Sequence, residues 1–137
     1  MIDIHAHILP GVDDGPLSME ESMKMARLAY EDGTKMMVAT PHNRDVVSTS
    51  SWPDVRSLVN QMNRQLDSEG IDLRLLLGME NHLDLNLPRD IAQGTALTIN
   101  SGDYIFVVLQ CSGLPSYIVS IFYVIIELWL FAIFGHH

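Results

Sequence analysis

Short apolar runs and amphipathic helical stretches alternate along most of this sequence. The apolar runs are typical of buried strands and cover residues 1–4, 35–39, 72–77 and 104–109. Two of the stretches between them carry apolar side chains at helical spacing. Alternation of strand and helix favours parallel strands joined by right-handed crossover helices. The order of these segments therefore predicts an α/β fold.

The two helical stretches have clear starts and stops. Ser18 and Glu21 have the spacing of a capping box, in which the hydroxyl group accepts from the backbone and the carboxylate reaches back. This helix is expected to stop at Gly33. A second helix is expected to begin near Pro53 and to end at Gly70.

Side chains that bind metals follow three of the predicted strands. His5 and His7 follow the first strand, His42 the second and Glu80 the third. Because His5 and His7 are two residues apart on an extended segment, they point to the same side and can bind one cation together. Each of these residues alone is commonly a surface or solvated group. Their recurrence at successive strand ends, where a parallel barrel gathers its functional groups, favours a metal site.

The loop after the histidine pair adds two carboxylates. Asp13 and Asp14 are close enough in sequence to His7 for their side chains to lie at the same strand ends. Imidazole and carboxylate ligands together suit Zn, Mn or Fe, whereas a set of carboxylates alone would suit Mg or Ca better.

Charge and cysteine content exclude several classes of function. The 137 residues carry 17 Asp and Glu against 8 Lys and Arg, a formal charge of −9. This argues against nucleic acid as a partner, because phosphate binding needs clustered cations. The single cysteine, Cys111, excludes an internal disulfide framework. A cysteine-nucleophile phosphatase also needs an arginine shortly after its cysteine to bind phosphate. No arginine follows Cys111, since the last one in the sequence is Arg89. The N-terminus has no secretory signal, so a cytoplasmic location is expected.

Three segments resemble one known family. Residues 1–16, 38–42 and 78–80 are similar to the motifs of the PHP-type (polymerase and histidinol phosphatase) tyrosine-protein phosphatases, bacterial enzymes of capsule and exopolysaccharide regulation. The resemblance implies an α/β fold that is the N-terminal half of a distorted PHP-type (βα)7 TIM-like barrel, since a whole barrel needs about 250 residues. On this comparison residues 1–137 form a single, incomplete domain, with metal motifs in 1–90 and an apolar helix–strand tail in 104–137.

The same resemblance implies a cluster of up to three metal ions, with manganese expected and Fe, Zn and Mg as the alternatives. His5, His7 and Glu80 would hold the first ion, and Glu80 would bridge to the second. Asp14 and His42 would contribute to the third. The implied reaction is hydrolysis of phosphotyrosine in proteins by a metal-activated hydroxide.

Two further residues complete the implied site. His136 is a candidate ligand of the second ion, unless it and His137 are the remnant of a tag. Arg44 is the nearby cation that could bind a substrate phosphate, and the alternative is a solvated loop arginine. The implied substrate is a phosphotyrosine protein, in particular a bacterial tyrosine kinase of polysaccharide export. The residues with implied catalytic roles are His5, His7, His42 and Glu80.

The sequence departs from the family pattern in three places. Val108 stands where the family has a metal-binding glutamate, and valine cannot coordinate an ion. The acidic residue and arginine that follow the histidine matching His136, and a later Asp-x-His motif, are expected by the family pattern but are not in residues 1–137. The tail is also unusual, because Glu127 is the only charged side chain in 104–137. Segment 117–134 reaches the lower limit of length and hydropathy for a membrane span, although Glu127 falls inside it. The family comparison predicts instead a helix followed by a strand that ends at His136.

Three functions follow from these observations. The leading hypothesis is a metal-dependent tyrosine phosphatase. The first alternative is a non-catalytic remnant that binds a metal or a partner, with the apolar tail as a possible oligomer contact. The second alternative is a protein tethered to a membrane by segment 117–134.

Overall fold

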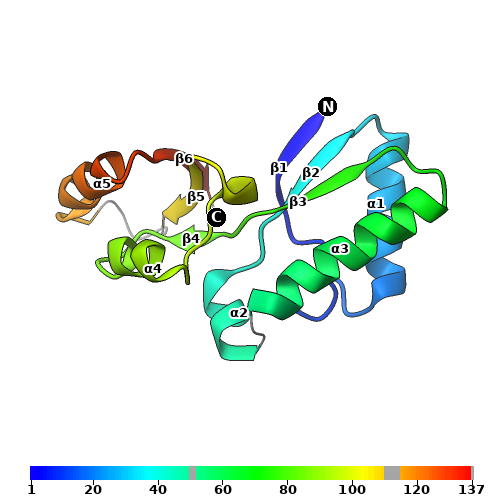
Figure 1. Cartoon of the computed structure of the whole chain (residues 1–137), viewed down its shortest axis with the longest axis horizontal. Coiled ribbons are helices and arrows are strands. Elements are labelled where there is room, and N and C mark those ends of the chain that lie inside the picture. The colour runs from blue at the N-terminus through cyan, green and yellow to red at the C-terminus, as the bar shows by residue number, and fades with distance from the viewer. Residues whose placement is uncertain (50–51, 110–114, 137) are drawn as a thin grey trace.

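The computed structural model describes residues 1–49, 52–109 and 115–136 (Figure 1). The strands are β1 (Ile2–Ala6), β2 (Met36–Ala39), β3 (Arg74–Leu77), β4 (Asn81–His82), β5 (Tyr104–Leu109) and β6 (Phe131–His136). The helices are α1 (Met19–Glu31), α2 (Asn43–Thr49), α3 (Trp52–Ser68), α4 (Leu87–Gln93), α5 (Ile118–Glu127) and a short 3-10 helix, η1 (Ile99–Ser101).

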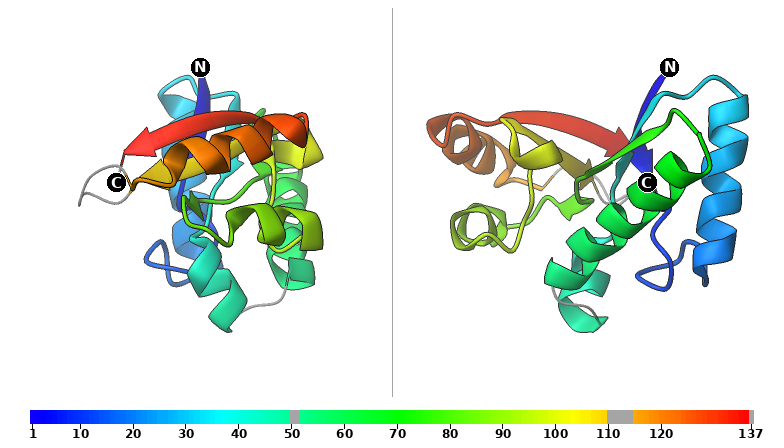
Figure 2. Two further views of the ribbon diagram at one scale, coloured as in Figure 1. Left: turned by 90° about the vertical axis from the view of Figure 1, so that its left-hand side faces the viewer. Right: turned by 45° about the vertical axis from the view of Figure 1, so that its right-hand side comes forward.

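In the described parts of the chain, the paired strands run parallel, in two sheets of three strands each. Within each sheet the spatial order follows the chain, β1-β2-β3 and then β4-β5-β6. The segment between β3 and β4 carries the chain from one sheet to the other, and a parallel bridge between His42 and Glu80 lies at this junction. One sheet occupies each half of the molecule (Figures 1 and 2). The α/β prediction is confirmed, and the strands of the described residues form no closed barrel.

The first sheet and the helices α1 and α3 enclose the larger apolar core. Met23 and Ala26 come from one face of α1, Met62 and Leu66 from α3, and Leu75 from β3. All five are at most 1% exposed. The helical spacing of the apolar residues therefore serves core packing, as their sequence pattern predicts.

The outer edge of β3 is covered by a side chain of α3. An edge strand presents backbone groups that need partners, and β3 is the last strand of its sheet. Asn63 Nδ2 donates to the carbonyl oxygen of Leu75 at 2.9 Å, and the Leu75 N–H donates to Asn63 Oδ1 at 2.9 Å. Asn63 is only 6% exposed, so water cannot readily take its place.

The second core lies between the second sheet and the helices α4 and α5. Its buried members are Leu83, Leu87, Ala96, Ile105, Val107, Ile121 and Ile125. Because successive residues of a strand face opposite sides, Phe106 and Val108 face away from the core that contains Ile105 and Val107. The ring centroid of Phe106 lies 4.6 Å from that of His5. This other face of β5 is therefore turned toward β1.

The start of α1 agrees with the predicted cap, with one difference. Ser18 Oγ accepts from the Glu21 N–H at 3.2 Å, as a capping box requires. The Glu21 carboxylate accepts from the N–H of Leu17 at 2.7 Å, one residue before the expected Ser18. Gly33 and Gly70 adopt left-handed φ angles of 96° and 70° after α1 and α3, which confirms both predicted stops.

Helix α2 is absent from the sequence-based prediction, whereas α3 begins at Trp52, which places Pro53 in its first turn, as predicted. The first turn of α2 is held by the carbonyl oxygen of His42, which accepts from the N–H groups of Asp45 and Val46. Val46 is completely buried. A helix of only two turns offers too few apolar positions for a periodic signal, which explains the omission.

The apolar tail forms a helix and a strand. Helix α5 ends at Glu127, and β6 pairs with β5 from Phe131 to His136. The predicted helix followed by a strand is therefore confirmed, and segment 117–134 is not one continuous helix. Among the helices of the described residues, none combines the length and the apolar character needed to cross a membrane.

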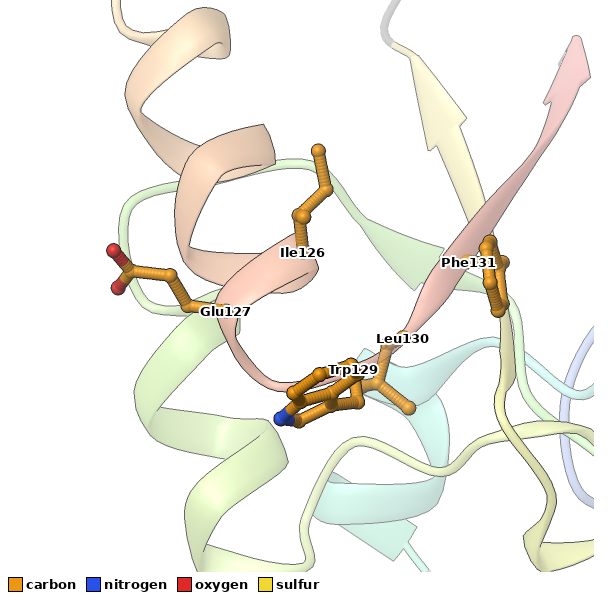
Figure 3. A pocket seen from close by; sticks show the side chains of 5 residues that line it. All are labelled: Ile126, Glu127, Trp129, Leu130 and Phe131. Atoms are coloured by element: carbon orange, nitrogen blue, oxygen red, sulfur yellow. The ribbon is translucent and has the colours of Figure 1, made fainter.

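The turn between α5 and β6 carries an exposed apolar groove (Figure 3). Its cavity has a volume of about 550 Å³ and is lined by Ile126, Glu127, Trp129, Leu130 and Phe131. Trp129 is 87% exposed and has a left-handed φ of 60°. Glu127 is the only charged residue of this lining.

The covered edge of β3 gives a prediction about stability. Replacing Asn63 by leucine leaves the N–H and carbonyl groups of Leu75 without their partners in a buried place. We expect the free energy of unfolding to fall by roughly 2–4 kcal/mol. Arg64→Ala, at the exposed neighbouring position, is the control and should change it by less than about 0.5 kcal/mol. Urea unfolding followed by circular dichroism measures both, and equal stability of the two variants would contradict this role of Asn63.

Candidate metal centre

The predicted ligands gather at the C-terminal ends of three neighbouring strands. His5 lies in β1 and His7 directly after it, His42 follows β2, and Glu80 follows β3. The three strands are parallel and adjacent, so their C-terminal ends lie at one edge of the sheet. This is the edge where α/β folds commonly place ligands.

Three donor atoms converge at this edge. Nε2 of His5 lies 3.2 Å from Nε2 of His7 and 2.9 Å from Oε2 of Glu80. Nε2 of His7 lies 3.0 Å from the same carboxylate oxygen. Neighbouring ligands of a six-coordinate ion with bonds of about 2.1 Å lie about 3.0 Å apart. The three atoms therefore have the spacing of one face of a coordination octahedron, and this donor set fits a divalent cation.

Glu80 supplies a buried negative charge to the group. Its side chain has no exposed surface. Burial raises the pKa of its carboxyl group, but the hydrogen bond with His5 and the charges of His42, His7 and His5 lower it, and the net pKa lies below its usual value. Its second oxygen, Oε1, lies 3.1 Å from Nδ1 of His42. One carboxylate therefore contacts imidazoles that follow two different strands.

A second group of possible ligands adjoins the first. Ligand atoms of His7, Asp13, Asp14 and His42 all lie within 4.8 Å of one another. Oδ1 of Asp14 is 3.3 Å from Nε2 of His42 and 3.4 Å from Nδ1 of His7. The Asp14 side chain is 71% exposed, so its carboxylate can turn toward a cation without losing a buried contact. The structure thus brings together Asp14 and His42, as the sequence predicts.

Asp13 occupies a different place from Asp14. Its side chain is 1% exposed, and its Oδ2 accepts from Nδ1 of His7 at 2.8 Å. This hydrogen bond raises the pKa of His7, although burial opposes the effect. Burial raises the pKa of the Asp13 carboxyl group, but hydrogen bonds from His7, Gly15 and His42 lower it below its usual value. The sequence gives Asp13 no separate role, and the Asp-Asp pair was the only signal of it.

Arg44, two residues after His42, shares a cavity with a histidine that the sequence does not single out. Arg44 and His82 line a small polar cavity of about 60 Å³, along with Asn43, Asp84, Leu87 and Asp90. Burial lowers the pKa of His82, and the positive charge of Arg44 lowers it further. His82 is in β4, two residues after Glu80, where the family motif ends and the sequence pattern gave no reason to expect a site residue.

The remaining candidates belong to the second sheet. His136 is the last residue of β6 and pairs with Leu109 of β5, at the C-terminal edge of that sheet. Val108 is 1% exposed and faces the same side as Phe106, whose ring is beside His5. Cys111 and His137 lie outside the described residues.

This arrangement can hold a divalent cation and leave positions open. A facial set of two imidazoles and one carboxylate covers one side of an ion, and the other side stays available to water or to an oxyanion. Such a centre is suited to hydrolysis, because a bound cation can both acidify water and neutralise an anionic substrate.

Comparison with known proteins agrees with this chemistry. Tyrosine-protein phosphatase YwqE of Bacillus subtilis is 36% identical over 123 residues, which are 90% of this chain and 48% of YwqE. Tyrosine-protein phosphatase CpsB of Streptococcus pneumoniae is 30% identical over 104 residues, 76% of this chain and 43% of CpsB. The chain therefore spans about half the length of the curated relatives it matches.

The fold has a close counterpart among solved structures. A chain from the crystal structures of YwqE from Bacillus subtilis and CpsB from Streptococcus pneumoniae, described as unique metal-dependent tyrosine phosphatases, matches with a TM-score of 0.92 at 33% identity. The match covers 99% of this chain and 55% of that one. The family model for capsular polysaccharide synthesis proteins CpsB/CapC matches residues 1–137. The chain belongs to the CpsB/CapC family of capsular polysaccharide synthesis proteins.

Proposed function

We propose that this chain carries the first part of a metal-dependent protein-tyrosine phosphatase centre. The observation that carries the proposal is the facial arrangement of His5, His7 and Glu80, with donor atoms 2.9 to 3.2 Å apart. The names of the relatives YwqE and CpsB support the reaction class. Phosphotyrosine in a protein is the proposed substrate, and a bacterial tyrosine kinase of polysaccharide export is the proposed protein.

The candidate ligands are assigned to different ions according to where they lie. His5, His7 and Glu80 would hold a first ion, and Asp14 with His42 would hold another, with Glu80 between the two groups. His136 is proposed as a ligand of a second ion, which Glu80 would share with the first. When bound, divalent cations lower the pKa of water and neutralise charge on phosphoryl oxygens. Mn is the proposed metal, with Fe, Zn and Mg as alternatives, since the set mixes imidazole and carboxylate.

Arg44 is proposed to bind the substrate phosphate. It is exposed, it lies two residues after His42, and it lines the polar cavity beside the centre. A guanidinium group can make two parallel hydrogen bonds to a phosphate, which would orient the phosphoryl group toward the ions. His82 lines the same cavity as Arg44.

Residues 1–137 would correspond to the N-terminal half of a distorted PHP-type (βα)7 barrel. Parallel strands in chain order, with site residues at their C-terminal ends, support this proposal. A single domain with metal motifs in 1–90 and an apolar helix–strand tail in 104–137 is the corresponding organisation. A cytoplasmic location remains a proposal.

A non-catalytic, partner-binding role is the second candidate. One observation favours it: the apolar groove beside Trp129 is exposed. The family resemblance adds that Val108 would stand where a metal-binding glutamate is expected. Mn²⁺ binding without any turnover of phosphotyrosine would support this alternative over the phosphatase.

Metal binding is the first test. We expect the purified chain to bind Mn²⁺, and His5→Ala or Glu80→Gln to lose about one ion per chain, because each removes a donor from the facial set. Glu31→Gln changes an exposed glutamate of α1 and should bind as the wild type does. Isothermal titration calorimetry and elemental analysis give affinity and stoichiometry. A wild-type chain without bound metal would contradict the proposed centre.

Catalysis is the second test. The chain should hydrolyse a phosphotyrosine peptide and p-nitrophenyl phosphate only when Mn²⁺ is present. Glu80→Gln should lower kcat/KM about 100-fold or more, because a metal contributes several kcal/mol to transition-state stabilisation. Glu31→Gln should keep the wild-type rate. Turnover that persists after chelation, or in Glu80→Gln, would exclude the proposed mechanism.

Val108 offers a gain-of-function test. A carboxylate introduced there would face the side on which Phe106 contacts His5. We expect Val108→Glu to raise Mn²⁺ affinity or stoichiometry, and to lower the thermal stability of the metal-free chain, since a buried unpaired charge is costly. Val108→Gln is the control, because its amide has a similar size but no charge. Equal Mn²⁺ binding by both variants would show that position 108 is too far from the ions.

A further inference from the structure

We infer that Asp13 is a positioning residue of the metal centre, which fixes both His7 and His42 and binds no ion itself. The inference rests on the proposed function, because it assigns Asp13 a part in the same centre. Asp13 and Asp14 are consecutive, but they have different partners, and we assign them different roles.

Both oxygens of the Asp13 carboxylate already have donors. Oδ2 accepts from Nδ1 of His7 at 2.8 Å and from the backbone N–H of His42 at 3.1 Å. Oδ1 accepts from the backbone N–H of Gly15 at 3.0 Å. Three donors and 1% exposure leave the Asp13 carboxylate little room for a cation, and a cation that displaced a donor would break a buried hydrogen bond, which is costly. Asp14, at 71% exposure, has no such constraint.

The bond to Asp13 decides which nitrogen of His7 can bind an ion. Both nitrogens of His7 face a carboxylate oxygen: Nδ1 lies 2.8 Å from Oδ2 of Asp13, and Nε2 lies 3.0 Å from Oε2 of Glu80. We expect the proton of the neutral imidazole on Nδ1, because the contact with Asp13 is the shorter of the two. Nε2, which lies beside Oε2 of Glu80 and Nε2 of His5, would then offer its lone pair to an ion. A carboxylate that holds the second nitrogen of a metal-binding histidine fixes its tautomer and ring orientation.

The same carboxylate links the ends of two strands. His7 follows β1 and His42 follows β2, and Asp13 binds the side chain of one and the backbone of the other. It therefore sets the spacing between ligands of the two groups in the centre. Removal of Asp13 should weaken both groups rather than one.

Gly15 keeps the Asp13 loop against β1. A Cβ atom at Gly15 would lie 2.7 Å from the carbonyl oxygen of His7 and 3.1 Å from Oδ1 of Asp13. Any side chain there would push the loop away from His7. Gly15→Ala therefore keeps the Asp13 carboxylate in the chain but moves it from its partners.

The test begins with the wild-type chain, without metal, so that it does not depend on metal binding. ¹⁵N NMR of the histidine side chains, at an alkaline pH where the imidazoles are neutral, reports which nitrogen carries the proton. His7, assigned by comparison with His7→Gln, should carry it on Nδ1. The proton on Nε2 in the wild type would overturn the inference, whether or not the chain is a phosphatase.

Two variants complete the test. Asparagine has one acceptor oxygen and cannot accept from all three donors, so Asp13→Asn should move the His7 proton toward Nε2. Its Mn²⁺ affinity should fall 10- to 100-fold, the usual effect of losing such a partner. Gly15→Ala should change both measurements in the same direction. Asp32→Asn, an exposed aspartate after α1, should change neither.

The outcomes separate the two proposals. An unchanged His7 tautomer in Asp13→Asn, or an unchanged Mn²⁺ affinity, would overturn the positioning role. Asp14→Asn is expected to lose about one ion per chain. The same loss in Asp13→Asn would identify Asp13 as a ligand and would also overturn the positioning role. A wild-type chain that binds no Mn²⁺ would contradict the proposed function. The tautomer measured without metal would still test whether Asp13 fixes the proton of His7.

Discussion

Glu80 is a buried carboxylate at the junction of the two sheets, and the candidate site depends on its being held there. Its N–H donates to the carbonyl oxygen of Pro41 at 3.0 Å, and its own carbonyl oxygen accepts from the N–H of Asn43 at 3.1 Å. The next residue, Asn81, is completely buried, and its Nδ2 donates to the carbonyl oxygen of Phe106 in β5 at 3.0 Å. A carboxylate removed from water needs polar partners, and imidazoles at the ends of β1 and β2 supply them. The charge that attracts a cation and the connection of the two sheets therefore rest on one short segment.

The two sheets have different surroundings, so charged side chains are distributed unevenly over the molecule. The first is covered by α1 and α3, whose outer faces are rich in charge, and its C-terminal edge carries the predicted ligands. The second is covered by α4 and α5, and from Tyr104 onward Glu127 is the only charged side chain. Phe106 and Val108 occupy the face of β5 that is turned toward His5. The first sheet thus supplies polar ligands to the centre, and β5 supplies an apolar wall.

Much of the fold and of the site could be predicted from local patterns. The strand–helix alternation predicts parallel strands, and parallel strands bring successive C-terminal ends to one edge, so His5, His7, His42 and Glu80 could be grouped before their distances were known. Helix α2 could not be predicted, because its two turns, which include the fully buried Val46, are too short to give a periodic pattern. His82 was overlooked because it follows the motif in β4, and only the cavity that it shares with Arg44 draws attention to it.

Spacing along the chain was enough to predict the element order, the choice of imidazole and carboxylate ligands, and the strand end that each one follows. Which donors face one another depends on how the folded chain packs. Asp13 and Asp14 are consecutive and chemically identical, yet one is buried under three hydrogen-bond donors and the other is exposed beside His42. That difference arises from the packing of a loop against the ends of β1 and β2, contacts between residues up to 29 positions apart. Hydrogen bonds that depend on three-dimensional proximity leave no trace in a local sequence pattern, and for that reason the division of roles between the two aspartates became visible only in the folded chain.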